Sequence, residues 1–265
     1  MKTKTSYPVP AVARAIAILE LLAESRRGSS ISELSHKLSL PKSSVHLLVK
    51  TLEEKGYLQK HPQTGHYRLG LKLVSLSKKA LDGLGLREEA RPFMQSIMKK
   101  TGLTVHLGVL EGSEAVIVEK IEAPGLIKLA TWVGRRLDAH CTGVGKALLA
   151  YLPEEEFDRL IKARALTRRN QKTIVSPGKL KRELLQVRSQ GYAFDDEEDE
   201  IGLRCIGAVI LDRDGRAIAA LSIAGTTAQI TAERVQPLAE LVQKTALSIS
   251  SHFDQFGVAS DAQLL

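Results

Sequence analysis

The chain has 265 residues, of which 43% are hydrophobic and 26% are charged, and its formal net charge is +8. These values are ordinary for a soluble globular protein and exclude a low-complexity chain, and the length is sufficient for two domains with their own cores. No apolar run approaches the roughly 20 residues of a membrane span, so we expect no membrane partner.

The N-terminus and the cysteines indicate the compartment. The first segment contains Lys2 and Lys4 but no apolar stretch, so we expect no secretory signal. Cys141 and Cys205 are the only cysteines, which is too few for a disulfide framework. A reducing cytoplasm is therefore the expected location.

Three helices are predicted at the start of the chain. In residues 10–24 apolar side chains recur at helical spacing, at Val12, Ala15, Ile16, Leu19 and Leu22. We expect this helix to pack behind the next two and to close a small core. Residues 31–38 are a short apolar-periodic segment, and Pro41 suits the first turn of the helix that follows because its φ is preset. That helix carries one apolar stripe, Val45, Leu48, Val49 and Leu52, and should end at Gly56.

A hairpin is predicted directly after these helices. Residues 57–60 and 66–69 are short alternating runs around a turn of five residues, 61–65. Helix, tight turn, helix and hairpin is the order of a winged helix-turn-helix, whose second helix enters the major groove of DNA.

The charge distribution favours the same interpretation. Residues 1–70 hold eleven Lys or Arg and five Asp or Glu, so +6 of the net +8 lies in about a quarter of the chain. Such a concentration is typical of phosphate binding. The expected partner is double-stranded operator DNA, and the alternative is a helix with a basic, solvated surface. The candidate DNA-binding residues are Lys42, Ser43, Ser44, His46, Lys50 and Arg68.

A second domain is predicted beyond the hairpin. Residues 71–84 form a linker helix, which divides the chain into a DNA-binding domain (9–70), a linker (71–85) and a C-terminal domain (86–258). The last helix begins at Thr231, and Pro237 should kink it. Helices are expected over residues 87–101, 143–152, 154–162 and 177–190, and strands over residues 104–110, 115–121, 127–133, 205–211 and 217–224. Hairpin strands flanked by helices predict an α+β fold.

Three motifs in this order resemble the IclR family of bacterial transcription regulators. They are LPKSSVHLLVKTLEEKGY (40–57), LDAHCTGVGKALLA (137–150) and GYAFDDEEDEIGLRCIGAVILDRDG (191–215), and the resemblance extends from about Val9 to Phe256. It implies an N-terminal winged helix that binds operator DNA and a GAF-like antiparallel-sheet domain that binds a small organic acid. It also implies a homodimer or homotetramer and repression of a catabolic operon.

The resemblance also implies a set of effector-binding residues. The N–H groups of Gly143 and Val144 would lie at a helix start, where free donors and the helix dipole favour a carboxylate. The implied residues are Gly143, Val144, Asp195, Cys205, Ser222, Leu126 and Leu137. For each, a structural role is the alternative: close packing for Gly143 and Gly145, a turn cap for Asp195, a core thiol for Cys205 and a backbone hydrogen bond for Ser222. Residues 196–200 are mostly expected to form a solvated acidic face.

The chain departs from the family pattern at three positions. Leu47 stands where the family often has Arg, and Ala224 replaces a small polar residue. Asp138 stands where the family often has an apolar residue or proline, and an extra carboxylate at the pocket mouth would disfavour an anion. With Trp132 and few other aromatic residues available to stack on a ring, a non-aromatic acid is favoured over an aromatic one.

Two other functions are considered. Cys141 and Cys205 could form a thiol redox switch that controls DNA binding. His140 beside Cys141 could indicate a cysteine-dependent enzyme, but neighbouring residues on a strand point to opposite faces. The sequence has no P-loop, zinc-ligand spacing or nucleophile elbow. We therefore expect a protein without enzymatic activity, cofactor or metal.

Overall fold

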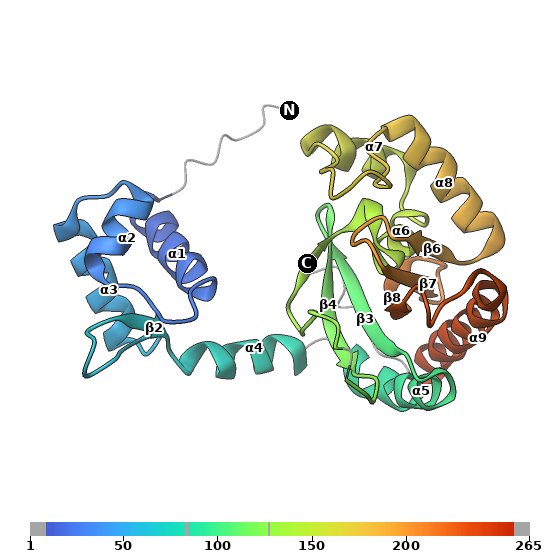
Figure 1. The fold of residues 1–265 in the computed structure, drawn as a ribbon, viewed down its shortest axis with the longest axis horizontal. Coiled ribbons are helices and arrows are strands. Elements are labelled where there is room, and N and C mark those ends of the chain that lie inside the picture. The colour runs from blue at the N-terminus through green and yellow to red at the C-terminus, as the bar shows by residue number, and fades with distance from the viewer. Residues whose placement is uncertain (1–8, 83–84, 127, 257–265) are drawn as a thin grey trace. The chain divides into compact units, whose positions relative to one another are not determined.

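The computed structural model describes residues 9–82, 85–126 and 128–256. The chain divides into two units, Met1–Gly83 and Leu84–Leu265, referred to below as the N-terminal and C-terminal units (Figure 1). Of the predicted linker helix, residues 83 and 84 lie outside the described residues, as do residues 257 and 258 at the predicted end of the second domain.

The N-terminal unit is a winged helix-turn-helix, as predicted. Its elements are α1 (Pro10–Ala23), α2 (Ile31–Leu38), α3 (Lys42–Glu54), β1 (Leu58–Lys60), β2 (Tyr67–Leu69) and α4 (Lys72–Asp82). Strands β1 and β2 pair antiparallel and form the wing. Seven buried side chains make its core: Ile18, Leu22, Leu34, Val45, Val49, Leu58 and Tyr67.

Local chemistry explains where these elements begin and end. Ser30 and Glu33 form a capping box at the start of α2, in which each side chain accepts from the other's backbone N–H. Pro41 is the residue before the first helical residue of α3, one position earlier than predicted. Gly56 follows α3 with φ +80°, a conformation that glycine adopts without strain.

The buried face of α1 differs in part from the predicted one. Leu22 is buried and Leu19 packs on the core, as predicted, and Ile18 joins them. Val12 and Ile16 are instead 56% and 49% exposed. Because α1 is apolar around most of its circumference, helical spacing alone could not identify which side faces the core.

The C-terminal unit is built on one antiparallel sheet, which confirms the α+β prediction. The strands lie in the order β5-β4-β3-β8-β7-β6. They are β3 (Thr104–Glu111), β4 (Glu114–Ile121), β5 (Arg136–Asp138), β6 (Ala193–Asp196), β7 (Leu203–Leu211) and β8 (Ala217–Thr226). The helices are α5 (Leu86–Thr101), η1 (Ala139–Cys141), α6 (Gly143–Leu149), α7 (Glu154–Ala163), α8 (Pro177–Gln190) and α9 (Ala232–Phe256). Helix α9 continues through Pro237.

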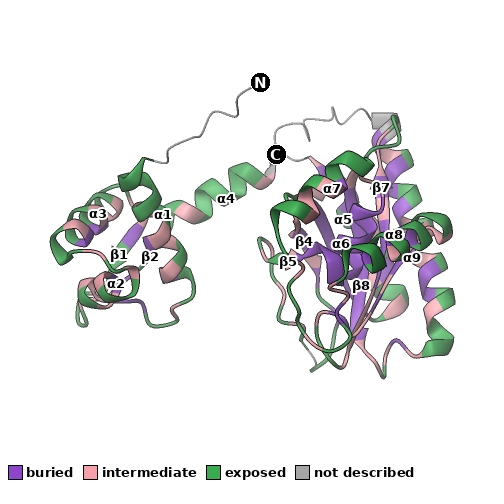
Figure 2. Cartoon of the chain, turned by 90° about the horizontal axis from the view of Figure 1, so that it is seen from above, coloured by how far each residue is buried: buried purple, intermediate pink, exposed green. Residues whose placement is uncertain are grey.

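Helices cover both faces of this sheet. Helices α5 and α9 pack on each other and on β3, β4, β7 and β8, while α6 packs on β3, β7 and β8 and is covered by α8 (Figure 1). The strands between these layers are largely buried (Figure 2).

The strand register places residues from four strands in two rows on the face that α6 covers. One row is Thr104, Ala224, Cys205 and Asp195, and the next is His106, Ser222, Gly207 and Ala193. Because side chains alternate between faces along a strand, these two rows point to the same side.

One predicted strand is wrong. Residues 128–133 are irregular, Ile127 lies outside the described residues, and the strand beside β4 is instead the short β5. Side chains hold this segment in place of a ladder: Lys120 Nζ donates to the carbonyls of Leu129 and Thr131 at 3.1 and 2.9 Å. The alternating apolar residues of this segment belong to an irregular loop, in which Leu129 and Ala130 line the cavity described below.

Candidate functional site

Helix α3 presents a polar, basic face. Lys42, Ser43, His46 and Lys50 are exposed, and the predicted Ser44 is half-buried at the edge of the core face. Among the described residues, neither lysine has a carboxylate within 4.0 Å. Ammonium groups without protein partners remain available to phosphates or to guanine.

Two further side chains belong to this surface. Leu47, where the resemblance led us to expect arginine, is 66% exposed on the same face of α3. On the wing, Arg68 is exposed, and its guanidinium donates to Gln59 Oε1 at 3.1 Å. An exposed leucine on a groove-reading helix can contact the methyl group of thymine.

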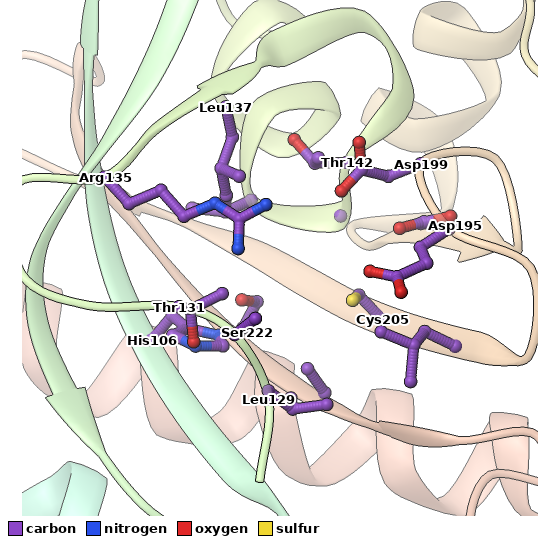
Figure 3. A pocket seen from close by; sticks show the side chains of 16 residues that line it. His106, Leu129, Thr131, Arg135, Leu137, Thr142, Asp195, Asp199, Cys205 and Ser222 are labelled. Atoms are coloured by element: carbon purple, nitrogen blue, oxygen red, sulfur yellow. The ribbon is translucent and has the colours of Figure 1, made fainter. Parts of the chain in front are cut away.

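The C-terminal unit contains a cavity of about 50 Å³ between α6 and the sheet (Figure 3). Its lining residues are His106, Leu129, Ala130, Thr131, Arg135, Leu137, Thr142, Gly143, Val144, Asp195, Asp199, Glu200, Leu203, Cys205, Ser222 and Ala224. Six of the seven residues predicted for the effector site are among them. The register of β6, β7 and β8 brings Asp195, Cys205 and Ser222 together across the sheet floor.

Leu126 is the exception and is a correction. Its side chain is fully exposed, and it lies on a separate cavity of about 160 Å³. The apolar wall of the central cavity comes instead from Leu129, Leu137 and Leu203. Leu129, three residues after Leu126, lines the central cavity in its place.

Gly143 packs closely against its neighbours and also lines the cavity. A Cβ on it would lie 3.1 Å from Cys205 Cβ, and a Cβ on Gly145 would lie 2.3 Å from Ala139 Cα. Both glycines therefore allow α6 to approach its neighbours closely. Gly143 and Val144 are also the first residues of α6, where N–H groups have no intrahelical acceptor, and both line the cavity.

Burial controls the ionisation of the acidic side of the cavity. Asp195 is 2% exposed, and burial raises the pKa of its carboxyl to about 7, although Lys146 and the backbone N–H of Glu198 oppose that rise. Burial likewise raises the pKa of Asp199. These carboxyls therefore take up protons far more readily than an exposed aspartate does.

The acidic run was wrongly expected to be mostly solvated. Glu198 is buried, Asp196, Glu197 and Asp199 are half-buried, and only Glu200 is exposed. Basic side chains compensate the run, since Lys146 pairs with Glu198, Lys172 with Glu197, Arg204 with Asp196 and Arg169 with Asp199.

Six polar residues that line the cavity were not predicted from the sequence: His106, Thr131, Arg135, Thr142, Asp199 and Glu200. His106 Nε2 lies 2.8 Å from Thr131 Oγ1, and burial, with help from Lys120 and Arg135, lowers the pKa of its imidazole to about 3. His106 is therefore neutral. Arg135 extends its guanidinium into the cavity (Figure 3). The signal in the sequence that pointed to these residues was His106, a single histidine inside the apolar strand β3.

Asp138 does not oppose an anion in the cavity, contrary to expectation. It is 4% exposed and lies outside the lining, and its Oδ2 accepts from Arg169 Nη2 at 2.5 Å and Nε at 2.8 Å. Arg164 adds a second cation at 3.6 Å from Oδ1. Two guanidinium groups compensate this carboxylate.

The thiols and His140 give no support to a nucleophilic site. Burial raises the pKa of both Cys141 and Cys205 above the usual range, so the reactive thiolate is scarce at neutral pH. His140 lies with Cys141 in η1, not in a strand, and its Nε2 is bonded to the carbonyl of Thr167. Among the described residues, no group of three or more His, Cys, Asp or Glu is placed to hold a metal ion, and no helix there is long and apolar enough to cross a membrane.

Comparison with known proteins identifies the family. Residues 11–62 match the IclR helix-turn-helix domain, and residues 78–251 match the bacterial transcriptional regulator IclR C-terminal domain. From Escherichia coli (strain K12), the HTH-type transcriptional regulator XynR is 36% identical over 91% of this chain and 96% of its own length. The transcriptional repressor IclR of that strain is 34% identical over 91% and 89%.

A solved structure agrees with these matches. An IclR homologue from Microbacterium hydrocarbonoxydans, complexed with 4-hydroxybenzoate, superposes with a TM-score of 0.78 at 26% identity, over 91% of this chain and 98% of that one. Both family domains are thus present in order, with the winged helix-turn-helix and the sheet domain that they require. The chain belongs to the IclR family of bacterial transcriptional regulators.

Proposed function

We propose that this protein is a cytoplasmic repressor that binds operator DNA through α3 and the β1–β2 wing and responds to a small carboxylate bound in the cavity of the C-terminal unit. The observation that carries the proposal is the coexistence of an unpaired basic face on α3 and a polar, mostly enclosed cavity in a separate unit. The relatives support its two halves. One is a repressor by name, and another is complexed with a small carboxylic acid.

The protein acts as a homodimer, or as a pair of dimers, in this proposal. Exposed apolar side chains support self-association, since monomeric proteins rarely leave many such residues on one small unit uncovered. In the N-terminal unit these are Val9, Val12, Ile16, Leu71, Val74 and Leu76. Two copies would present two α3 helices to the half-sites of a pseudo-palindromic operator.

Effector binding changes the spacing or angle of the two reading helices, and α4 transmits the change. A coupling free energy of about 1–3 kcal/mol suffices for a 5- to 150-fold change in operator affinity.

The DNA-binding half is tested by selecting duplexes from a random library and measuring fluorescence anisotropy on the selected sequence. The charge-reversed variant Lys42→Glu/Lys50→Glu should lose binding because it replaces two phosphate-directed cations by anions. The matched control, Lys99→Glu/Lys100→Glu, reverses two exposed lysines at the end of α5 and should bind nearly as the parent does. Equal binding by both variants, or no enrichment of any duplex, contradicts the proposal.

The effector half is tested with Ser222→Ala, which alters the cavity floor far from α3 in sequence. This variant should bind the selected duplex as tightly as the parent but should release it less in the presence of the acid. Unchanged release would remove Ser222 from the site.

A further inference from the structure

Arg135 differs from the other arginines near the cavity. Arg136, Arg164 and Arg169 each have carboxylate partners within 4.0 Å. Among the described residues Arg135 has none, and its guanidinium lies over the indole ring of Trp132, 5.2 Å from the ring centroid. The aromatic ring orients the cation but leaves its N–H donors free.

The free guanidinium points into the cavity from one side, and the carboxyls of Asp195 and Asp199 stand on the other side (Figure 3). Two neutral polar groups lie on the same side of the cavity as Arg135: His106, bonded to Thr131, and the hydroxyl of Ser222, opposite His106 in the register. Lys120 adds a cation behind His106, and the charged group that Arg135 acts on is Asp199, on the opposite side. A ligand carboxylate would therefore meet a guanidinium and neutral polar groups at this side. Arg is well suited to bind a carboxylate by two parallel hydrogen bonds.

The side of the cavity formed by Asp195 suits a different group. The carboxyl of Asp195 is buried, lines the cavity beside Cys205 and is an acceptor when ionised. A second carboxylate here would face the acidic side chains of Asp195 and Asp199. A hydroxyl group can donate to a carboxylate and can accept from a protonated carboxyl, so it suits Asp195 in either state.

We propose that Arg135 binds the carboxylate of the effector and that the Asp195 side binds a hydroxyl of the same molecule, so that the effector is a short hydroxy acid. The inference rests on the proposed function, because it names the ligand class of that same cavity. It reverses the orientation expected from the helix start alone, in which the carboxylate lies on α6. The cavity of about 50 Å³ has room for about three to five water-sized groups, at about 10–15 Å³ each, so it suits a small acid.

The test is isothermal titration calorimetry of the full chain with matched acids. The hydroxy acids are glycolate, lactate, glycerate and 3-hydroxybutyrate, and the comparison compounds are acetate, propionate, butyrate and 1,2-propanediol, which lack one of the two groups. At least one hydroxy acid should bind ten-fold or more tightly than its unsubstituted acid and than the diol. Equal binding of the unsubstituted acid overturns the hydroxyl assignment, and no binding of any hydroxy acid at 10 mM overturns the ligand class. Alanine is included, and tighter binding of its ammonium form than of lactate also overturns the assignment.

The role of Arg135 is tested separately with the hydroxy acid that binds best. Arg135→Gln should lower the affinity for this acid ten-fold or more, and Arg135→Lys should lower it less. The adjacent control, Arg136→Gln, should change the affinity less than two-fold. Thermal unfolding of each variant establishes that it is folded. Equal affinity in the parent and in folded Arg135→Gln overturns the assignment of Arg135.

Operator binding, followed in parallel, separates this inference from the proposed function. If a hydroxy acid binds but leaves DNA affinity unchanged, the regulatory function fails and the ligand assignment stands. If only an acid without a hydroxyl releases the DNA, the function stands and the ligand assignment fails.

Discussion

Lys146 Nζ lies 2.5 Å from Glu198 Oε1, although the lysine side chain is completely buried. The ammonium group also donates to Glu183 Oε1 at 3.1 Å and to the carbonyl of Phe194. Burial would lower the pKa of this lysine, but the two carboxylates raise it above its usual value, so the lysine is charged. The contact ties α6 to the segment that follows β6, the strand that carries Asp195.

Removing the cation should therefore destabilise the C-terminal unit strongly. Lys146→Met leaves Glu198 buried without a counter-ion, a change that costs about 3–5 kcal/mol and lowers Tm by about 6–20 °C in a unit of this size. Differential scanning calorimetry of the full chain measures the effect. In the control, Lys181→Met breaks an exposed pair with Glu154, which contributes little to stability because solvent screens it. Adding Glu198→Gln to Lys146→Met should restore part of the lost Tm. If Lys146→Met lowers Tm no more than Lys181→Met does, the buried pair does not stabilise the unit.

Asp195 should make the C-terminal unit less stable as pH rises from 4 to 7. Burial raises the pKa of its carboxyl from 3.8 to about 7, so in this range the folded chain holds a proton that the unfolded chain has released. Its contribution to the free energy of unfolding is fully present below about pH 4 and is lost as pH rises through 7, at most about 4 kcal/mol. Asp195→Asn should flatten the pH dependence measured by urea unfolding, whereas Asp214→Asn, in an exposed turn, should not. Parallel profiles for the parent and Asp195→Asn would exclude this effect.

Leu47 and Lys50 should affect DNA binding in different ways. Lys50→Ala should weaken binding to all sequences and reduce the slope of log K against log salt by about 1, because one phosphate contact is lost. Leu47→Ala should keep that slope and lose affinity only for duplexes with thymine at one position, because a methyl contact carries sequence information. Anisotropy titrations over a salt series, with single-base variants of the selected duplex, separate the two. A Leu47→Ala protein with unchanged sequence preference would place this side chain outside the groove.

The capping box of α2 should contribute measurably to the N-terminal unit. Ser30 Oγ accepts from the Glu33 N–H at 3.2 Å, and Glu33 Oε2 accepts from the Ser30 N–H at 2.7 Å. Ser30→Ala should cost about 0.5–2 kcal/mol of unfolding free energy, since a helix-end N–H loses its partner. Ser32→Ala changes an exposed serine two residues along, in the first turn of α2, and serves as the control in the same calorimetric scan. Equal Tm values for the two variants would show that the cap contributes nothing.

The N-terminal unit could be predicted almost entirely because its information is local. The stripe from Val45 to Leu52, the stop at Gly56 and the hairpin turn each depend on residues a few positions apart. The largest difference was the exposure of Val12 and Ile16 on α1, because an apolar helix with several possible faces needs its neighbours to define the buried one.

The effector cavity depended on longer-range information. The sequence by itself determined the family, the fold class and six of the seven expected lining residues. Only the tertiary structure decided that Thr131 and Arg135 reach the cavity, that Leu126 does not, and that Asp138 is compensated. The physical reason is that strand register and ion pairing join residues such as Asp195 and Lys146, which are far apart in the chain, and no periodicity within one segment carries that information.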